Sequence, residues 1–486
     1  MTSPALAHDA ALVTLDRGSD QSSHVISLDK AQRTVFVMVI AAIVAAVAAP
    51  YPVTKIILGG TLALYWATLF FNFDERFVGL FVLLLPTLVL APLETLGIPG
   101  LNWQTVFLLI FLVAAASMEA PPSPHSVSGW MSFFSVVLIL AAAHAWLAQP
   151  QAAWPLLMVV KNWLFPFSLF VLGRRLVRNR QQLWFLVLCV AVASCALALH
   201  GLRDGLTAGN LLTNRPMGLL TGQANLFAAF LAMHALLLLF ASRTADLGRA
   251  ERLLLTGTAV LMMATLLFTL SRGAWLAFAV TAAVVGFSTN RGLVVFLVVV
   301  MLVGYRWAPR EAVTRADLTV RAVEQSDDSP DSSLEESLDD SAALRIIQWK
   351  SFPTLFLESP VWGTGLGTYP ERLHAKTGIF RPAHATMVQL GAEMGVLGLL
   401  GYLGLLGAVA VSCVRRARQA GRGSFERAAG LGLLAATLCL FLLDFSGARF
   451  RAHTVTTYYW LLAGAFLGCT DRAPAPVASR DETTDN

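Results

Sequence analysis

The sequence predicts an all-α protein, a polytopic transmembrane bundle of about 12–14 helices with one large extracytoplasmic loop that carries short interfacial helices. Composition is the first reason. Of the 486 residues, 56% are hydrophobic and only 13% are charged, whereas soluble domains carry about 25% charged residues. The second reason is that the apolar residues fall into runs of roughly 20, the length that crosses the hydrocarbon core of a bilayer.

About fourteen apolar segments are candidate spans. They lie at about residues 34–49, 53–72, 77–96, 104–117, 128–147, 154–173, 182–199, 224–241, 253–270, 274–289, 292–306, 391–413, 428–444 and 455–470. The chain should therefore divide into a cytoplasmic N-terminal tail (1–33), transmembrane helices (34–306), a periplasmic loop (307–390), further transmembrane helices (391–470) and a cytoplasmic C-terminal tail (471–486). The tail at 1–33 has no signal-peptide pattern, so we expect the first helix to stay uncleaved.

Basic residues predict the orientation of the bundle. Three short loops are rich in arginine, at Arg174–Arg180, Arg243–Arg252 and Arg415–Arg427. With the N-terminus inside, all three loops fall on the cytoplasmic side, as the positive-inside rule expects. The net charge of +5 is explained by this topology, so we expect no nucleic-acid partner.

The predicted loop at 307–390 has parts of different character. Residues 324–340 are rich in Asp, Glu and Ser, which is typical of a solvated segment. Calcium binding is the weaker alternative, because the EF-hand spacing with its central glycine is absent. Residues 343–362 carry apolar side chains at helical spacing and predict a helix on the membrane surface. The glycine-rich segment 363–369 that follows predicts a tight turn.

The five cysteines give no sign of a metal centre or of disulfides. All of them lie inside apolar segments, without a CxxC or Cys/His spacing. We therefore expect neither zinc nor disulfide bonds.

Arg272 lies in the only break of a long apolar run, between the candidate spans 253–270 and 274–289. An arginine at a helix centre costs about 2.5–3.5 kcal/mol on insertion scales, so this one needs water or a partner. The topology places the break on the outer face. At the start of a helix, Arg272 would also face the positive end of the helix dipole. An anionic ligand would relieve that conflict. The alternative is a side chain that snorkels to a lipid phosphate.

Other polar residues are expected on the same outer face. Arg215 precedes Asn225 at the start of a helix, and Arg449 and Arg451 lie in a later loop. Two or three guanidinium groups around one cavity suit a diphosphate, because their forked N–H donors match its oxygens. His384 lies just before an apolar helix, and its pKa near neutral suits a general base. The simpler alternatives are snorkeling arginines and an interfacial histidine.

At these positions the chain resembles the O-antigen ligase and O-antigen polymerase superfamily of bacterial membrane glycosyltransferases. The resemblance covers residues 200–440, whereas residues 1–180 match only as a hydrophobic bundle. It rests, in order, on Arg215-Pro-Met-Gly with Asn225, Ser271-Arg272-Gly273-Ala274, Arg345 with Trp349, the segment from Pro360 to Tyr369, His384 with Leu390-Gly391, and Gly395 with Gly398. Two departures are Ala385, where the family often has a small polar residue, and the acidic segment 324–340.

The resemblance implies a metal-independent, inverting glycosyltransferase in the bacterial inner membrane, with its active site facing the periplasm and a role in lipopolysaccharide or other surface polysaccharide biosynthesis. The donor would be a glycan on undecaprenyl diphosphate, and the acceptor another glycan, the lipid A core or a protein. Membrane lipids are the remaining partners, and no cofactor is implied. The implied site residues are His384 as the base, Arg272 and Arg215 on the diphosphate, and Asn225, Arg345 and Arg449 as further substrate contacts.

Polymerase, ligase and transporter functions are all compatible with a polytopic bundle. We favour a polymerase over a ligase, because about fourteen predicted spans exceed the roughly twelve expected of a ligase. A solute or ion transporter is the non-enzymatic alternative. It would need ionisable residues along a pathway at the membrane midplane, and Lys161, His144 and His234 are the candidates. It would not need arginines gathered on one face.

Overall fold

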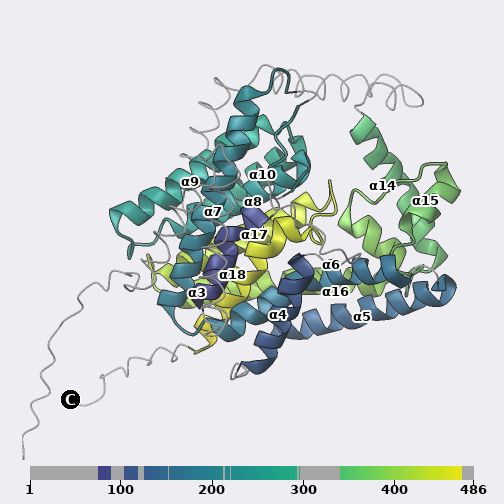
Figure 1. The fold of residues 1–486 in the computed structure, drawn as a ribbon, viewed down its shortest axis with the longest axis horizontal. Helices are drawn as coiled ribbons and strands as arrows, with labels where there is room; N and C mark the ends of the chain where they lie inside the picture. The colour runs from purple at the N-terminus through teal and green to yellow at the C-terminus, as the bar shows by residue number, and fades with distance from the viewer. Residues whose placement is uncertain are drawn as a thin grey trace, which may run out of the picture.

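The part of the chain that the computed structural model describes is helical, with no strand (Figure 1). It comprises residues 75–88, 103–118, 125–150, 153–211, 214–218, 221–289, 291–292, 295 and 340–472. Several predicted segments lie wholly or mostly outside the described residues. These are the tail at 1–33, the candidate spans 34–49, 53–72 and 292–306, the acidic segment 324–340 and the tail at 471–486.

Thirteen helices are described, and eight of them are long and apolar enough to cross a membrane. The eight are α5 (Ser126–Ala148), α6 (Ala153–Leu176), α7 (Arg180–Thr207), α8 (Ala224–Ala241), α9 (Arg249–Phe268), α10 (Arg272–Thr289), α16 (Thr386–Gln419) and α17 (Phe425–Leu443). The others are α3 (Glu75–Leu88), α4 (Trp103–Ser117), α14 (Asp340–Glu358), α15 (Tyr369–Thr377) and α18 (His453–Arg472). The predicted all-α polytopic fold is confirmed, and the total number of spans stays a prediction.

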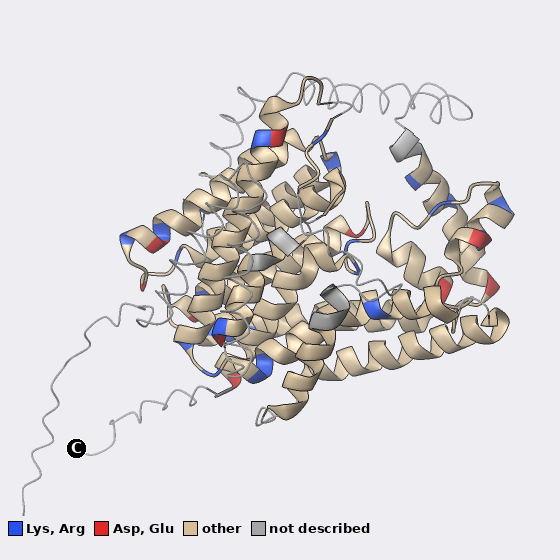
Figure 2. Ribbon diagram, viewed as in Figure 1, with Lys and Arg blue, Asp and Glu red and all other residues tan. Residues whose placement is uncertain are grey.

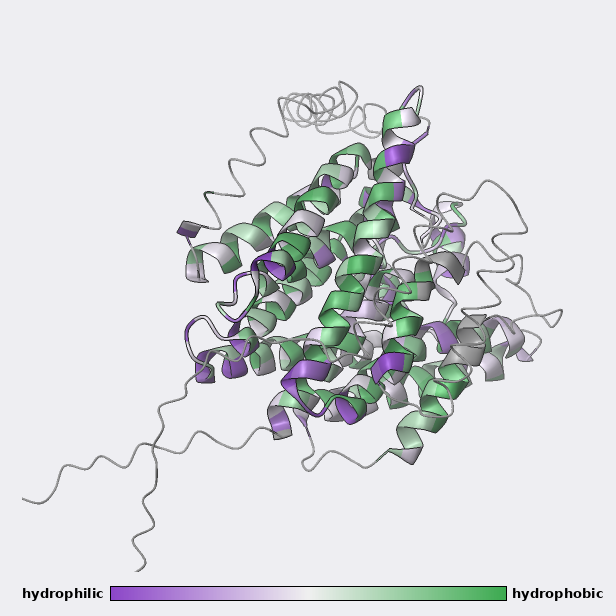
Figure 3. Cartoon of the chain, turned by 60° about the vertical axis from the view of Figure 1, so that its left-hand side comes forward, coloured by the Kyte–Doolittle hydropathy of each residue, from purple (hydrophilic) through white to green (hydrophobic). Residues whose placement is uncertain are grey.

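Hydropathy and charge follow the helices as expected of a membrane bundle. Hydrophobic residues dominate the long helices, and hydrophilic residues gather at their ends and in loops (Figure 3). Most charged residues lie at helix ends, in loops, or on α14 and α15 (Figure 2). The helices α14 and α15 stand on one side of the bundle, with α9 on the opposite side (Figure 1).

Two helices extend beyond the predicted spans. The apolar run of α7 ends at 199, but the helix continues to Thr207. An ion pair between His200 and Asp204, 3.2 Å apart, lies in this polar extension. Likewise α16 begins at Thr386 and not at 391. Backbone hydrogen bonding does not stop where hydrophobicity stops, so the helices protrude past the apolar part.

The helices α6 and α18 pack with their backbones in contact. A side chain at Gly173 of α6 would collide with the main chain of α18, and side chains at Gly464 and Gly468 would collide with the main chain of α6. Small residues of this kind let transmembrane helices approach closely, so that dispersion forces hold them together. This seam fixes α18 against the rest of the bundle.

One end of α17 gathers the three basic loops. Arg180 forms an ion pair with Asp246 and a second one, at 3.3 Å, with Glu426. The N–H of Ala245 donates to the carbonyl oxygen of Gly423 at 2.8 Å. These contacts bring the loops before α7, before α9 and before α17 to one side of the molecule, which we call the basic face.

The opposite end of α17 gathers the segments that were predicted to be outside. A side chain at Gly273, in the first turn of α10, would meet Ser446 Oγ at 2.7 Å. The Nε of Arg345 on α14 donates to the Ser446 carbonyl oxygen at 3.0 Å. We call this end the site face. The 19-residue helix α17 is about 28 Å long, so the two faces are a membrane thickness apart, as the predicted topology requires.

The carboxylate of Asp444 joins α16, α17 and the loop before α18. It is fully buried. Its Oδ1 accepts hydrogen bonds from Thr386 Oγ1 at 2.5 Å and from the N–H groups of Arg449 at 2.7 Å and Phe450 at 2.9 Å. Its Oδ2 accepts one from the Tyr402 hydroxyl at 2.8 Å. These four hydrogen bonds satisfy both oxygens of the buried carboxylate, so Asp444 holds the three segments together.

The helix α16 is broken at Gly395, where φ is 60° and ψ is −154°. Residues 360–366, which include the first part of the predicted turn at 363–369, fit into the break. There the N–H of Thr364 donates to Ala392 O at 2.9 Å, and the N–H of Val396 donates to Pro360 O at 2.8 Å. A side chain at Gly363 would collide with the α16 backbone. The segment expected to be only a tight turn therefore satisfies the backbone groups that the broken helix leaves unpaired.

Replacing Gly464 with alanine should destabilise the bundle. The new methyl group would meet the Phe170 carbonyl oxygen, and overpacking of this kind costs roughly 1–3 kcal/mol. Gly257→Ala in α9 is the matched control, because a side chain there meets nothing within 4 Å. Thermal unfolding of the two purified variants in detergent provides the measurement. Equal midpoints for both variants and the unaltered protein would contradict the proposed seam.

Asp444→Ala should be far more damaging than Asp444→Asn. Alanine leaves four buried donors without an acceptor, and each loss costs about 1–3 kcal/mol. In Asp444→Asn the amide oxygen can still accept the three donors at Oδ1, and its NH2 group can donate to the Tyr402 hydroxyl. Folded yield and thermal midpoint should fall in the alanine variant and remain near normal in the asparagine variant. The reverse order would show that the charge, and not the hydrogen bonds, holds this junction.

Candidate functional site

Arg215 connects α8 to the turn that precedes Arg272. Its Nε donates to the Thr269 carbonyl oxygen at 2.7 Å, and its terminal NH2 donates to Asn225 Oδ1 at 2.7 Å. Asn225 lies in the first turn of α8, and Thr269 ends α9. The two residues that the sequence singled out, Arg215 and Asn225, are therefore direct partners.

The turn between α9 and α10 is strained. Leu270 has a φ of 51°, the only positive value at a non-glycine residue in the part of the chain that the structure describes. For a residue with a Cβ this conformation costs about 1–2 kcal/mol, and it persists only where the surroundings enforce it. Leu270 is buried with Leu211, and Trp275 Nε1 donates to Leu266 O at 3.0 Å. These contacts fix the point at which α10 begins.

Arg272 is the first residue of α10 and is half-buried. Its position at the helix start places the guanidinium at the end where the first N–H groups lack helical partners. The adjacent Gly273 packs on Ser446, so the start of α10 lies against the loop between α17 and α18.

Two contacts hold α14 against that loop. One is the hydrogen bond from Arg345 to the Ser446 carbonyl oxygen. The other is Trp349, whose ring stacks on Phe445 with centroids 6.0 Å apart and whose Nε1 donates to Phe445 O at 3.4 Å. Arg345 of α14 and Gly273 of α10 thus both contact Ser446.

The main chain around His384 is fixed by a buried amide. Gln348 of α14, 1% exposed, accepts a hydrogen bond from the N–H of His384 at 2.7 Å. Its Nε2 donates to Pro382 O at 3.0 Å. The His384 imidazole is half-buried, and α16 begins two residues later. Gln348 therefore sets the position of the His384 backbone relative to α14.

The surroundings of His384 favour the neutral imidazole. Burial lowers its pKa first, and the positive charges of Arg345, Arg449 and Arg381 lower it further. These three guanidiniums are therefore close enough to act on His384 electrostatically. A neutral imidazole at neutral pH is the form that can accept a proton.

Arg449 is a buried cation that is only partly satisfied. It is 8% exposed, and its Nε has no hydrogen-bond partner among the described residues. Its guanidinium lies on Gly447, where a side chain would collide with it. Burial lowers the pKa of Arg449 to about 10, opposed by the Asp444 carboxylate. A buried, incompletely paired guanidinium is suited to binding an anion.

Arg451 interacts electrostatically with Glu393, whereas Arg449 interacts with Asp444. Burial lowers its pKa, and Glu393 opposes that shift. Glu393 is fully buried in α16, where it accepts hydrogen bonds from Gln389 Nε2 at 3.1 Å and from the N–H of Tyr369 at 3.3 Å. Arg451 therefore supports the broken part of α16.

Sequence reasoning assigned no role to Asp444, Glu393 or Gln348. Asp444 and Glu393 carry the signal that singled out Arg272, an ionisable side chain within or next to an apolar run. Gln348 lies in a surface-helix pattern, and nothing in the sequence separates it from an exposed glutamine.

The three transporter candidates lie on different helices and differ in burial. His144 is exposed on α5, whereas Lys161 is half-buried on α6. His234 is buried in α8, where its ring stacks on Phe230 with centroids 4.3 Å apart and its Nδ1 lies 2.9 Å from Phe230 O. The position of His234 is explained by packing and a hydrogen bond within its own helix.

The part of the chain that the structure describes holds no group of three or more His, Cys, Asp or Glu residues that could bind a metal ion. The site face as described contains guanidiniums, the His384 imidazole and main-chain donors. Such groups can hold a multiply charged anion and accept a proton beside it.

The family model described as O-antigen ligase matches residues 257–403. The matched segment contains Arg272, Arg345 and His384, whereas Arg215 and Arg449 lie outside it and are joined to it by the contacts above. A search of curated proteins finds no match to the chain. The match supports a relation to the superfamily of O-antigen ligases and polymerases, and the described helices are those of a polytopic membrane protein.

Proposed function

We propose that this protein transfers a glycan from undecaprenyl diphosphate to an acceptor hydroxyl, at the periplasmic face of the bacterial inner membrane, in surface polysaccharide biosynthesis. One observation carries the proposal. Arg345 and Arg449 act electrostatically on His384, and the start of α10 packs on Ser446, whose carbonyl oxygen accepts a hydrogen bond from Arg345. We call Arg215, Arg272, Arg345 and Arg449, which lie in these connected segments, the basic cluster.

The basic cluster is suited to the diphosphate of the donor. Arg272 at the start of α10 offers a fork of N–H donors next to the N–H groups of the first helical turn. The incompletely paired Nε of Arg449 offers a further donor. When the bond from the anomeric carbon to the diphosphate oxygen breaks, negative charge grows on that oxygen. Fixed positive groups stabilise this charge more in the transition state than in the ground state.

His384 is the proposed base. Its neutral imidazole would accept the proton of the acceptor hydroxyl as the hydroxyl oxygen forms a bond to the anomeric carbon. The diphosphate leaves from the opposite side with the electron pair of the broken bond, so the configuration inverts. Gln348 holds the backbone of His384, which limits the movement of the imidazole and so supports a single attack geometry. The guanidiniums supply the charge that a metal ion supplies elsewhere, so we expect a chelator to leave activity unchanged.

Two versions of this proposal differ in the molecule that accepts the glycan. We favour a second lipid-linked glycan, which makes the protein a polymerase, on the number of predicted spans. The description of the matched family favours lipid A core, which makes it a ligase. Incubation of the purified protein with a defined undecaprenyl-diphosphate glycan distinguishes them. A polymerase yields a ladder of longer lipid-linked chains from the donor alone, whereas a ligase gives product only when lipid A core is added.

Substitutions at Arg272 and His384 should reduce transfer in that assay. Arg272→Ala removes one oxyanion-stabilising donor group and should lower kcat by about 100-fold or more, and Arg272→Lys should restore only a part because lysine lacks the fork. His384→Ala should lower kcat by about 10²–10⁴-fold. Arg249→Ala on the basic face is the control and should keep normal activity. Full activity of the Arg272→Ala and His384→Ala proteins at equal folded yield would refute the assigned site.

The pH dependence of kcat/KM should change when the charged residues around His384 are replaced. Because the pKa of His384 is lowered from 6.5, the neutral base dominates at neutral pH, and kcat/KM should fall only as the pH drops below 6.5. Arg345→Gln removes a lowering charge, so the pKa of His384 should rise and the acid limb should move to higher pH. Arg381→Gln should move it the same way by less, since Arg381 has the smallest effect of the three. An acid limb that stays in place in both variants would exclude His384 as the titrating base.

A further inference from the structure

An apolar groove runs between α10, α16 and α17. Its volume is about 390 Å³. It is lined by Val284, Val285, Ser288 and Thr289 of α10, by Leu403, Leu406, Gly407 and Ala410 of α16, and by Leu434, Thr437, Leu438 and Phe441 of α17. Val284 and Leu403 are 53% and 44% exposed, so the groove opens sideways, toward the lipid in a membrane. The volume and the apolar lining of the groove suit a hydrocarbon chain.

At the basic face this groove meets a second, polar cavity. The second cavity has a volume of about 120 Å³. It is lined by Phe240, Arg243, Thr289, Gly423, Ser424, Arg427, Ala428 and Leu431. Thr289 lines both cavities, so the two are neighbours. The polar cavity has two arginines and no acidic residue in its lining, which makes it suited to a negatively charged group.

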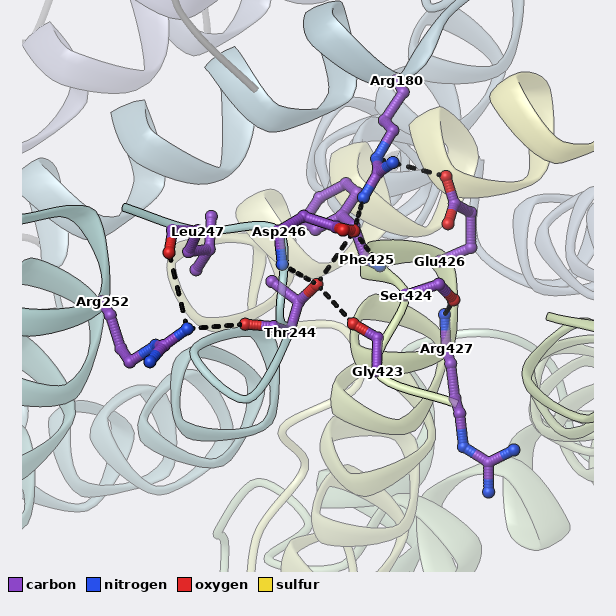
Figure 4. A network of polar contacts seen from close by, with 10 residues as sticks. All are labelled: Arg180, Thr244, Asp246, Leu247, Arg252, Gly423, Ser424, Phe425, Glu426 and Arg427. Carbon is purple, nitrogen blue, oxygen red and sulfur yellow. Dashed lines mark hydrogen bonds and ion pairs between the residues drawn. The ribbon is translucent and has the colours of Figure 1, made fainter. Parts of the chain in front are cut away.

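A network of polar contacts builds the wall of the polar cavity (Figure 4). The Thr244 hydroxyl donates to Gly423 O at 2.9 Å, and the N–H of Phe425 donates to Asp246 Oδ2 at 3.1 Å. These bonds fasten the loop before α9 to the start of α17. The cavity wall is therefore fixed by interactions between two loops that are far apart in the sequence.

The same network engages the nearby acidic residues. Asp246 and Glu426 both pair with Arg180. The Arg427 guanidinium extends away from this network in Figure 4. The guanidinium donates a long hydrogen bond of 3.4 Å to the Ala417 carbonyl oxygen, and it forms no ion pair with a carboxylate in the part of the chain that the structure describes. Asp246 and Glu426 thus do not neutralise the charge of Arg427.

We propose that these two cavities form a binding site for an anionic phospholipid of the leaflet on the basic face. The phosphate would lie between Arg243 and Arg427, and one acyl chain would follow the groove between α10 and α16. A basic pocket that continues into an apolar groove matches a molecule with a phosphate head and a hydrocarbon tail. A free phosphate would leave the groove unfilled. The donor's diphosphate binds at the other end of α17, about 28 Å away.

The bound lipid would connect helices of the site face. It would touch α10, which begins with Arg272, and α16, which begins two residues after His384. Lipid binding on the basic face would therefore stabilise the relative placement of two helices that carry the transfer site, without contact with the reacting groups.

The test measures lipid binding to the purified full-length protein. The protein is stripped of lipid in detergent and titrated with phosphatidylglycerol or phosphatidylcholine, and the thermal midpoint and the bound lipid, by native mass spectrometry, are recorded. Phosphatidylglycerol should bind and raise the midpoint, and phosphatidylcholine should bind about tenfold more weakly or worse. Arg243→Gln combined with Arg427→Gln should remove this preference. Arg249→Gln combined with Arg422→Gln, two exposed arginines that line neither cavity, should keep it.

A second variant tests the groove separately from the arginines. Gly407 lines the groove, and a side chain there meets nothing within 4 Å, so Gly407→Leu should fill the space without disturbing the fold. It should weaken phosphatidylglycerol binding as strongly as the double arginine variant does. Equal binding of the two lipids, or unchanged preference in the double arginine variant, overturns the proposal. Binding of undecaprenyl phosphate that Gly407→Leu abolishes and the arginine changes leave intact would assign the groove to the donor tail and overturn it as well.

Discussion

The hydrogen-bonded carboxylate of Asp444 is the constraint on which the site face depends. Four donors from α16 and from the loop before α18 converge on this one buried side chain. They fix Thr386, and through it the segment that contains His384, against the loop that contains Arg449. A carboxylate in a membrane protein interior is costly unless each oxygen is satisfied. The geometry that satisfies Asp444 is therefore the geometry that brings the imidazole and the guanidinium together.

The arginines of this chain divide into two groups by what they contact. On the basic face, Arg180 and Arg174 form ion pairs with buried or half-buried carboxylates. These ion pairs hold loops together. On the site face, Arg215 and Arg345 donate to main-chain or amide oxygens, and Arg449 retains an unpaired Nε. Bonds to neutral oxygens position a guanidinium without neutralising it. The described contacts of the two groups therefore differ in kind, with ion pairs on the basic face and hydrogen bonds to neutral oxygens on the site face.

Irregular backbone is concentrated where the site is built. The positive φ of Leu270 precedes Arg272, and the break at Gly395 follows His384 by three helical turns. In both places a second segment supplies the missing contacts, Arg215 to the Thr269 carbonyl oxygen in one and the glycine-rich segment 360–366 to the α16 backbone in the other. Backbone polar groups in a membrane must be paired within the protein. Each irregularity therefore ties a distant part of the chain to the site.

The helical class, the approximate bounds of most described spans and the candidate residues Arg272 and His384 could be predicted from the amino-acid sequence alone. Apolar runs dictate spans through the cost of burying polar backbone in lipid, and Arg272 and His384 stood out because charge is rare in such runs. The sequence could not show that Arg215 bonds Asn225, that Ser446 contacts both Gly273 and Arg345, or that Asp444 and Gln348 organise the segment around His384. Those contacts link residues that are distant along the chain, and hydropathy carries no information about which helices become neighbours. These contacts depend on the tertiary structure, because helix packing in a membrane is set by close fits and hydrogen bonds between particular side chains.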